Sequence, residues 1–518
     1  MKVFFRIEYP LGSIDVKEES LGIYTANTQL LANLIKYSQV IEEYGLVVSD
    51  LSEEEKLKEL FPHKVINGHE FNREDELIAV LRYYDVFFMA GYGIYDILKC
   101  EHLFQGNLSV VGITYSLSLD EIVKSIKDAS KICTGKDTLI CISSSAKNCV
   151  EKILGGRDYS LRLETIPLGV DINKYRPTDE ATKKRLRRDF GLPDDATIFL
   201  YLGRLSPCSK MELTPFLKAF FDLTEMPECG DKTHLLVVGR EHTSGYIEVL
   251  KSLATKLRIM DRVSIISSYD SSNIPLYYNV ADIFVSPSDN IQETFGLTVL
   301  EAMASGLPVI ATDWDGYRDT VVDGTTGFLI PTYWADCGIS WHRKFQLAQS
   351  VAMDIDRLVE SMRVLLENKD LRKTMGEASR RRVESKFAWE KVIKNYDTLF
   401  HRLASGSRNK SKEDSRAIAD SSGIILSPVE VFKAWPTEFV TEGFRIRLRD
   451  IKGFTGYTDI IRLVDGEIVN HIANLIAKNI TSVGDITRIL GREREIPVHE
   501  TLFQIMVMLK YGVFAPAF

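Results

Sequence analysis

Residues 287–308, PSDNIQETFGLTVLEAMASGLP, are the most informative part of the sequence because they read as a loop, a helix and a helix stop in that order. The apolar run Ile283–Val285 precedes it and has the length of a buried strand. Gly306 suits the left-handed position after a last helical turn, and Pro308 cannot continue the helix. The pattern therefore predicts a strand followed by a helix that begins near Thr294.

Similar apolar runs recur on both sides of this stretch, with amphipathic segments between them. Strands that alternate with helices predict parallel sheets, and the pattern restarts after a charged segment at 183–188. We therefore predict an α/β chain with two Rossmann-like domains at residues 1–177 and 178–385, and a helix at 386–404 that packs back on the first domain. The expected strands are residues 1–6, 86–89, 109–113 and 139–142 in the first domain, and 198–202, 235–238, 263–266, 283–285 and 309–311 in the second.

The C-terminal part of the chain has a different composition. Residues 405–420 are polar without apolar periodicity and are predicted to be a linker, whereas residues 421–518 should form a separate small α+β module that resembles a winged helix. The module has eleven Lys and Arg against eleven Asp and Glu, a balance that favours an interaction or dimerisation role over nucleic-acid binding. Recognition of a peptide or protein substrate is the alternative. The apolar residues expected to pair in a homodimer are Phe503, Met506, Met508 and Leu509.

Composition excludes several classes of protein. The formal charge of −8 gives no support to nucleic-acid binding, and the hydrophobic content of 45% excludes a largely disordered chain. The seven cysteines form no C-x-x-C pair, so we expect a reducing, cytoplasmic environment. No apolar run has the roughly 20 residues that a membrane span needs, which leaves only peripheral membrane contact open.

Two glutamates flank the start of the predicted helix. Backbone N–H groups at the first turn of a helix can hold an anion such as a diphosphate, and Gly296 permits close approach. Glu293 lies just before this helix and Glu301 lies within it, and each carboxylate can accept two hydroxyl hydrogen bonds from a sugar. The competing interpretation is that Glu293 is an ordinary helix N-terminal acid and Glu301 a surface residue.

Two cations follow the first strand of the second domain. Gly203 and Arg204 close that strand, and Lys210 lies in the loop after it. The carboxyl ends of parallel strands are where open α/β sheets bind ligands, so these cations favour an anionic ligand. The basic runs at 183–188 and 380–382 are instead interpreted as solvated helix faces.

These residues together resemble the retaining glycosyltransferases of the GT-B architecture, in particular the large family-four group. Four signatures occur in order: Gly203-Arg204-Leu205 followed by Lys210, Val237-Val238-Gly239, the pair Glu293 and Glu301, and the glycine-rich residues 312–330. The match is specific over about 196–400, diffuse over 1–177 and absent from 421–518.

The resemblance implies a metal-independent, retaining transfer of a sugar from a nucleotide-sugar such as a UDP- or GDP-sugar, with no cofactor. It implies that Arg204 and Lys210 bind the donor diphosphate, Glu301 the ribose and Glu293 the transferred sugar. The remaining donor-binding positions that it implies are Gly203, Thr294, Phe295, Gly296, Leu297 and Thr298.

The chain departs from the family in the first domain. The glycine pair of the N-terminal loop is not evident, its nearest counterpart being residues 22–27, and Tyr115 stands where many members have a histidine. A tyrosine hydroxyl can give one hydrogen bond, so Tyr115 is a candidate catalytic-site residue, with packing as the alternative. The acceptor is not identified. A phosphorylase or epimerase on the same fold, and a binding protein that has lost the reaction, are the alternative functions.

Overall fold

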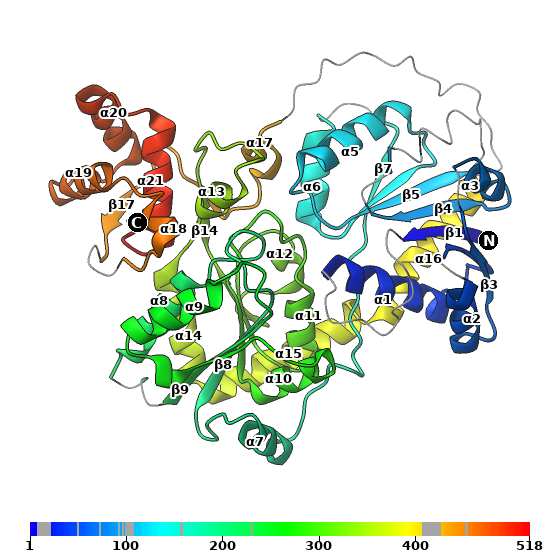
Figure 1. Ribbon diagram of the computed structural model, residues 1–518, viewed down its shortest axis with the longest axis horizontal. Helices are drawn as coiled ribbons and strands as arrows, with labels where there is room; N and C mark the ends of the chain where they lie inside the picture. Colours follow the sequence, from blue (N-terminus) through cyan, green and yellow to red (C-terminus); the bar gives the residue numbers. More distant parts are fainter. Residues whose placement is uncertain are drawn as a thin grey trace. The chain divides into compact units, whose positions relative to one another are not determined.

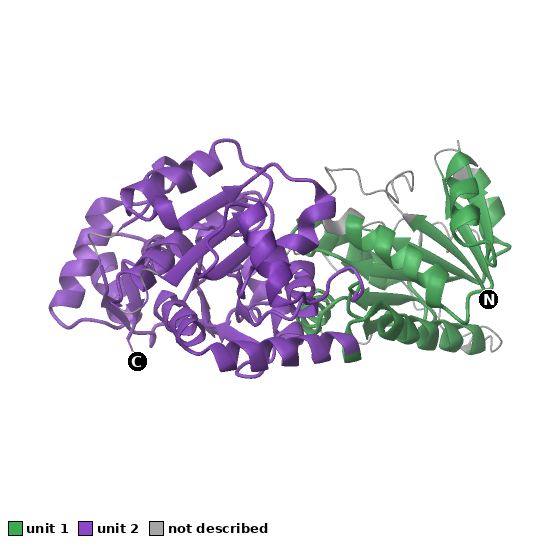
Figure 2. Cartoon of the chain, turned by 90° about the horizontal axis from the view of Figure 1, so that it is seen from below, with its two compact units in different colours: residues 1–171, 385–426 green, residues 172–384, 427–518 purple. Residues whose placement is uncertain are grey.

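The structure is a computed structural model. It describes residues 1–7, 22–48, 51–71, 74–91, 94–95, 98, 108–155, 159–227, 229, 232–406, 426–450 and 454–517. These form two compact units, coloured separately in Figure 2: residues 1–171 with 385–426, and residues 172–384 with 427–518. The second unit is therefore discontinuous in sequence.

A seven-stranded parallel sheet forms the centre of the first unit, in the order β3-β2-β1-β4-β5-β6-β7 (Figure 1). Every residue of β4 and β5 is buried, as expected for strands that are covered on both faces. The sequence-predicted strands are confirmed. The strands are β1 (Lys2–Ile7), β2 (Glu43–Val47), β3 (Val65–His69), β4 (Val86–Ala90), β5 (Ser109–Thr114), β6 (Thr138–Cys141) and β7 (Arg162–Thr165).

The helices of the first unit include one that comes from far along the chain. Helix α16 (Trp389–Gly406) packs against α1 (Gly22–Tyr37), and the Ser38 hydroxyl donates a hydrogen bond of 2.5 Å to Asp397 of α16. The other helices of this unit are α2 (Leu51–Leu60), α3 (Glu74–Leu81), α5 (Asp120–Ile132) and α6 (Ser144–Ile153).

The second unit is built on a six-stranded parallel sheet in the order β10-β9-β8-β11-β12-β13. Its strands are β8 (Thr197–Leu202), β9 (Thr233–Val238), β10 (Val263–Ile266), β11 (Ile283–Ser286), β12 (Val309–Thr312) and β13 (Gly327–Ile330). Its helices are α7 (Glu180–Asp189), α8 (Thr214–Thr224), α9 (Tyr246–Lys256), α10 (Ile274–Val280), α11 (Leu297–Ala304), α12 (Tyr317–Thr320), α14 (Ile355–Glu367) and α15 (Lys369–Lys386).

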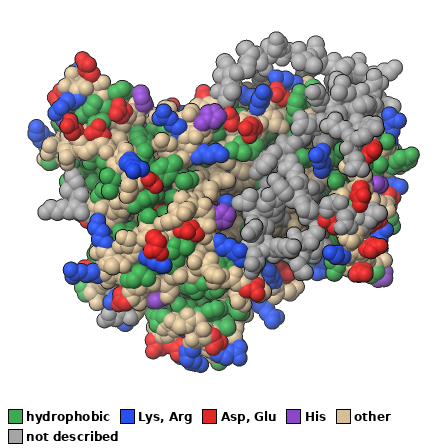
Figure 3. Space-filling view, viewed as in Figure 1, with side chains coloured by type: hydrophobic (Ala, Val, Ile, Leu, Met, Phe, Trp, Pro, Cys, Tyr) green, Lys and Arg blue, Asp and Glu red, His purple; other side chains and the backbone are tan. Residues whose placement is uncertain are grey.

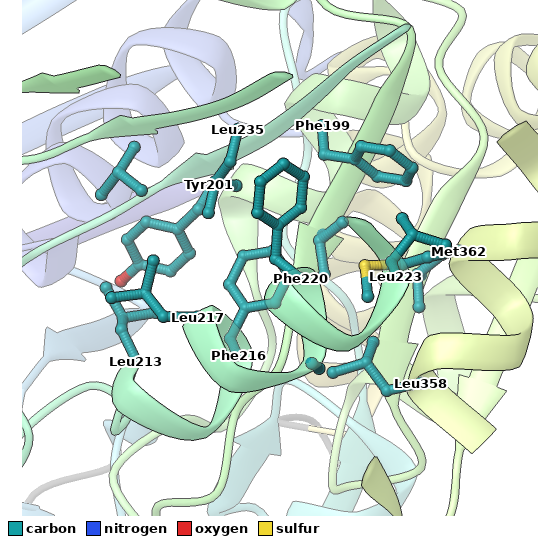
Figure 4. Packing of buried hydrophobic residues seen from close by; sticks show 14 of the residues in the cluster. Phe199, Tyr201, Leu213, Phe216, Leu217, Phe220, Leu223, Leu235, Leu358 and Met362 are labelled. Carbon is teal, nitrogen blue, oxygen red and sulfur yellow. The ribbon is translucent and has the colours of Figure 1, made fainter. Parts of the chain in front are cut away.

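The core of this sheet lies between β8, β9, α8 and α14 (Figure 4). Phe199 and Tyr201 of β8 pack on Phe216 and Phe220 of α8, and all four side chains are buried. The apolar run of β8 is thus explained by helices that cover the sheet. This packing fixes the carboxyl end of β8, from which the candidate site begins.

The C-terminal residues do not stand apart from the second unit, although the sequence favoured a separate module. Strand β16 (Glu438–Phe439) pairs with β14 (Thr332–Trp334), which also pairs with β15 (Val351–Met353). The composition of residues 405–420 could not show this, because strand pairing and a shared core form over a long sequence separation. The remaining elements are α13 (Lys344–Gln349), α17 (Pro428–Phe432), α18 (Thr458–Ile461), α19 (Gly466–Ala477), α20 (Val483–Arg494), α21 (Val498–Lys510), β17 (Ile446–Leu448) and β18 (Phe514–Pro516).

Helix α21 does not present the apolar face that was expected to pair in a homodimer. Met506, Met508 and Leu509 are buried in a core that also contains Tyr333 and Ala352 of the preceding domain, and Phe503 is partly buried against it. The chain itself covers this face. The sequence argument for a dimer contact on α21 is therefore wrong.

The two basic runs are not simply solvated helix faces. The Arg187 guanidinium is buried and donates to the carbonyls of Val280, Asp194 and Ala196. Arg380 donates to the carbonyls of residues 172, 175 and 304, and Arg382 to those of residues 319 and 320. These guanidinium groups therefore satisfy backbone carbonyls at helix ends and turns within the second unit. On the face shown in Figure 3, acidic and basic side chains are interspersed.

Candidate functional site

The candidate site lies where the chain order of the second sheet reverses. Strands β8 and β11 are neighbours, but β9 and β10 lie on one side of them and β12 and β13 on the other. The loops that follow β8 and β11 therefore leave in opposite directions, and the carboxyl edge between such loops is the crevice in which doubly wound sheets bind ligands. All predicted donor residues are on these two loops or on α11.

Lys210 and Glu293, 83 residues apart, form an ion pair across this crevice. The exposed fraction of the side chain is 14% for Lys210 and 10% for Glu293. Burial by itself would raise the pKa of Glu293, but the Lys210 ammonium and the Arg204 guanidinium outweigh burial and lower that pKa. Glu293 is therefore ionised at neutral pH and held close to two cations.

Arg204 lies beside the Lys210 loop. Its guanidinium donates to the Ser209 carbonyl at 3.2 Å, and its own carbonyl accepts from the Tyr201 hydroxyl at 3.0 Å. The structure thus brings Arg204, Lys210 and Glu293 together, as the sequence predicted. Their mutual positions are set by the loops that follow β8 and β11.

Two glycines are required by the backbone around these side chains. A Cβ on Gly239 would lie 1.8 Å from the carbonyl oxygen of Gly203, so the loops after β8 and β9 meet backbone to backbone. Gly296 has φ +86°, and a Cβ there would lie 2.2 Å from the ring of Tyr317. Any other residue at Gly296 would meet both backbone strain and a buried aromatic ring.

Helix α11 begins at Leu297, three residues later than predicted, because Gly296 takes the left-handed conformation at its N-cap. Among the described hydrogen bonds, none is donated by the amides of Gly296, Leu297 and Thr298, so these amides can meet an anion. The Phe295 amide instead contributes to lowering the pKa of Glu293 by a hydrogen bond. The side chains of Thr294 and Phe295 are buried.

Glu301 lies one turn into α11 and is only partly exposed. The Tyr278 hydroxyl donates to its Oε2 at 2.8 Å. Burial raises the pKa of Glu301, against hydrogen bonds from Tyr278 and Tyr175 that lower it. Glu301 is therefore a held carboxylate and not a free surface acid, with acceptor capacity left for a ligand hydroxyl.

Tyr115 belongs to the other unit. It directly follows β5 and is buried, with 7% of its surface exposed. Its proposed role at a catalytic site stays a prediction. Gly22, in the other departure from the family pattern, begins helix α1.

Two general properties bear on the site. In the described part of the chain, no three His, Cys, Asp or Glu side chains gather as a metal site. The helices that the structure describes include none with the length and apolar character to cross a membrane.

The sequence did not single out the residues that hold the two loops in place. Asn290 donates to the Cys208 carbonyl at 2.6 Å, and the Trp314 indole donates to the Asn290 carbonyl at 3.0 Å. Asp289 accepts from the Glu212 amide at 3.2 Å. Asp289 lies within residues 287–308, but its partners lie far away in sequence.

Comparison with known proteins matches this region to one family. Residues 182–337 match the family model described as Glycosyl transferases group 1. The D-inositol 3-phosphate glycosyltransferase 2 of Catenulispora acidiphila is 37% identical over 172 residues, which are 33% of this chain and 39% of that protein. The D-inositol 3-phosphate glycosyltransferase of Nocardia farcinica is 32% identical over 200 residues, or 38% of this chain and 42% of that protein. The chain thus spans about two fifths of these relatives.

Solved structures match a larger part of the chain. HepE of Anabaena in complex with UDP covers 78% of this chain and 99% of its own, with a TM-score of 0.55 and 17% identity. The sucrose-phosphate synthase of Thermosynechococcus elongatus covers 78% of this chain and all of its own, with a TM-score of 0.57 and 19% identity. At this identity the likeness concerns the fold, which is GT-B.

Proposed function

Because residues 182–337 are a Glycosyl transferases group 1 domain within a GT-B fold, we propose that the protein is a glycosyltransferase that uses a nucleotide-sugar donor. The observation that carries the proposal is the Lys210–Glu293 ion pair beside Arg204 at the switch point of the second sheet. In this arrangement, cations that can bind a diphosphate lie next to a carboxylate that can bind a sugar.

The proposed roles follow from charge. Departure of a nucleoside diphosphate leaves negative charge on its phosphate oxygens, and Arg204, Lys210 and the amides of 296–298 supply donors for that charge. Such groups stabilise the transition state more than the ground state, because the charge grows as the glycosidic bond breaks. They do the neutralising that a divalent ion does elsewhere, so we propose a metal-independent reaction.

The two carboxylates divide the rest of the donor. Glu293 is ionised, is paired with Lys210, and precedes the N-cap of α11, which suits hydroxyls of the transferred hexose next to the diphosphate. Glu301, held by Tyr278, is one turn further along and suits the ribose. With no nucleophile required beside the anomeric carbon, the acceptor hydroxyl attacks from the side on which the diphosphate leaves. Its proton passes to the departing phosphate oxygen, and the anomeric configuration is retained.

The donor base is proposed by analogy. HepE of Anabaena was solved with UDP and with UDP-glucose, which makes UDP-sugars the first donors to test, ahead of GDP-sugars. The acceptor is unidentified and can be a small molecule, a glycan, a lipid or a peptide.

A donor screen tests the proposal. UDP-, GDP- and ADP-sugars are compared by thermal shift, and a ligand at 100 times its Kd stabilises the protein by about 2.7 kcal/mol. Release of nucleoside diphosphate is then measured with and without EDTA, and the anomer of the product by NMR. Binding without any release would favour the binding-protein alternative, and an inverted product or loss of release in EDTA would contradict retention or metal independence.

A further inference from the structure

We propose that the C-terminal residues 427–518 hold the loops of the donor site in place, with Lys510 and Tyr457 as positioning residues for the loops that carry Lys210 and Glu293. The structural part of this proposal stands by itself. The kinetic part rests on the proposed function.

Lys510 is the last residue of α21 and reaches the loop after β11. Its ammonium forms an ion pair with Asp289, and each of these side chains is only 1% exposed. The same ammonium donates to the carbonyls of Ala348 at 2.9 Å and Val351 at 3.1 Å. A lysine ammonium has three donors, and all three are used here. Asp289 lies four residues before Glu293, so this contact fixes the base of the Glu293 loop.

Glu212 fixes the other loop in the same manner. It lies two residues after Lys210 and is fully buried. Its Oε1 accepts from the Tyr246 hydroxyl at 2.7 Å and the Thr214 hydroxyl at 2.8 Å, while its Oε2 accepts from the Tyr457 hydroxyl at 3.0 Å. Among the described residues of the C-terminal part, Tyr457 alone donates a hydrogen bond to Oε2 of Glu212.

The two anchored loops are also joined to each other. The Glu212 amide donates to Asp289, and the Asn290 side chain donates to the Cys208 carbonyl. Lys510 and Tyr457 therefore hold one connected hydrogen-bond network that includes both loops. The Lys210–Glu293 pair lies on the same loops and is more exposed than the Lys510–Asp289 pair. A small displacement of this network would separate the groups that meet the donor.

Stability alone is a weak explanation for this network. Burial raises the pKa of Asp289 to about 6, although the Lys510 ammonium acts to lower it. The charged form of Asp289 therefore carries a desolvation cost that the ion pair offsets only in part. A buried ion pair is often replaceable by apolar residues without loss of stability. A charged pair adds one defined geometry, because a buried carboxylate and a buried ammonium are satisfied only when they lie within hydrogen-bond distance of each other.

A second pair of contacts between the same regions offers a matched control. Arg449 forms ion pairs with Asp222 of α8 at 2.7 Å and Asp356 of α14 at 2.6 Å. It docks C-terminal residues on the domain, as Lys510 does, but has no described contact with residues 206–213 or 289–293. Arg449→Met therefore reports the effect of loosening the docking without removing the proposed anchor.

This inference reverses an expectation from sequence. If residues 421–518 were a separate module behind a polar linker, as the sequence predicted, donor binding would survive removal of residues 410–518. In the structure, that truncation would leave Asp289 buried without its cation. An unpaired buried charge is strongly destabilising, so truncation cannot separate anchoring from unfolding, and single substitutions are needed.

The test compares Lys510→Met, Tyr457→Phe and Arg449→Met in the full chain. Hydrogen exchange by mass spectrometry measures the loops 206–213 and 289–296, and needs no donor. We expect faster exchange of both loops in Lys510→Met, a smaller change in the same direction in Tyr457→Phe, and wild-type exchange of these loops in Arg449→Met. Unchanged loops in both anchor variants, or equal opening in Arg449→Met, would overturn the proposal. Tyr457→Phe removes one hydroxyl, and it keeps the test valid if Lys510→Met does not fold.

Kinetics and a double variant complete the test. We expect kcat/KM for the donor to fall about tenfold or more in Lys510→Met, measured well below its Tm, and to stay near wild type in Arg449→Met. Asp289→Asn combined with Lys510→Met should recover part of the loop protection, because it removes the uncompensated charge. A merely structural Lys510 would lower Tm but leave the donor KM and the loop exchange unchanged. If wild-type protein binds no nucleotide-sugar, the proposed function fails while the exchange data still decide the anchoring.

Discussion

The two parallel sheets of this protein repeat each other at one edge and differ at the other. With strands numbered along the chain within each unit, both have the order 3-2-1-4-5-6, and the first continues to a seventh strand. At the amino edge, Asp85 before β4 accepts from the Lys2 amide at 2.8 Å, and Asp282 before β11 accepts from the Ile198 amide at 2.7 Å. In both sheets, the aspartate before the fourth strand accepts a hydrogen bond from a backbone amide at the start of the first strand.

The described residues at the two carboxyl edges differ. The described residues directly after β4, β5 and β6 of the first sheet are Gly91, Tyr115 and Ile142, none of which carries a charge. The loops of the second sheet carry Arg204, Lys210 and Glu293 at the equivalent edge. We infer that the amino edge serves the fold, whereas the carboxyl edge of the second sheet serves the proposed chemistry.

The largest expected effect is at the carboxyl edge. Arg204→Ala or Lys210→Ala should cost on the order of 3 kcal/mol of transition-state stabilisation, or about 100-fold in kcat, because each removes a donor to the leaving diphosphate. Steady-state kinetics and thermal denaturation are measured together. An unchanged kcat would show that the substituted cation takes no part in the reaction, and the two edges would then not differ in function.

The amino edge should affect stability and leave the chemistry alone. Asp282 pairs with Lys183 and with the buried Arg187, each at 2.6 Å, so Asp282→Asn should lower the free energy of unfolding by about 3 kcal/mol. Asp85, an exposed aspartate, is the matched position in the first sheet, and Asp85→Asn should change Tm much less. Denaturation curves give both values, and a fall in kcat of the folded Asp282→Asn protein would contradict the division of edges.

The smallest expected effect concerns the pH dependence of donor binding. Burial raises the pKa of Glu301, so this carboxylate becomes protonated as pH falls towards that raised value and loses acceptor capacity for the ribose. The donor KM should therefore rise as the solution is made more acidic. Glu301→Gln should show a KM about tenfold higher at pH 8 and little further change with pH. A wild-type KM that is flat between pH 5 and 8 would assign the ribose to another group.

Local pattern was sufficient for nine strands of the two main sheets and for the crevice residues, but it did not single out β2, β3, β7 or β13. The predicted strands are short apolar runs, and Arg204, Lys210 and Glu293 lie at most eight residues after the end of one, so the sheet topology brings them together. The start of α11 was misplaced because the left-handed Gly296 delays the helix. Lys510 could not be found, since its partner Asp289 is 221 residues away and a lone lysine at a helix end is most often a solvated residue.

The discontinuity of the second unit sets an order on events during synthesis. After residue 384 the chain leaves this unit to supply α16 to the first, and returns to it at residue 427. On a ribosome, the sheet from β8 to β13 is complete while Asp289 still lacks its cation, because Lys510 is made 221 residues later. Until Lys510 has been made, Asp289 of the nascent second unit is therefore either protonated or on a loop that is open to water. A chaperone or protease that acts on translating chains would meet the donor loop in this unfinished form.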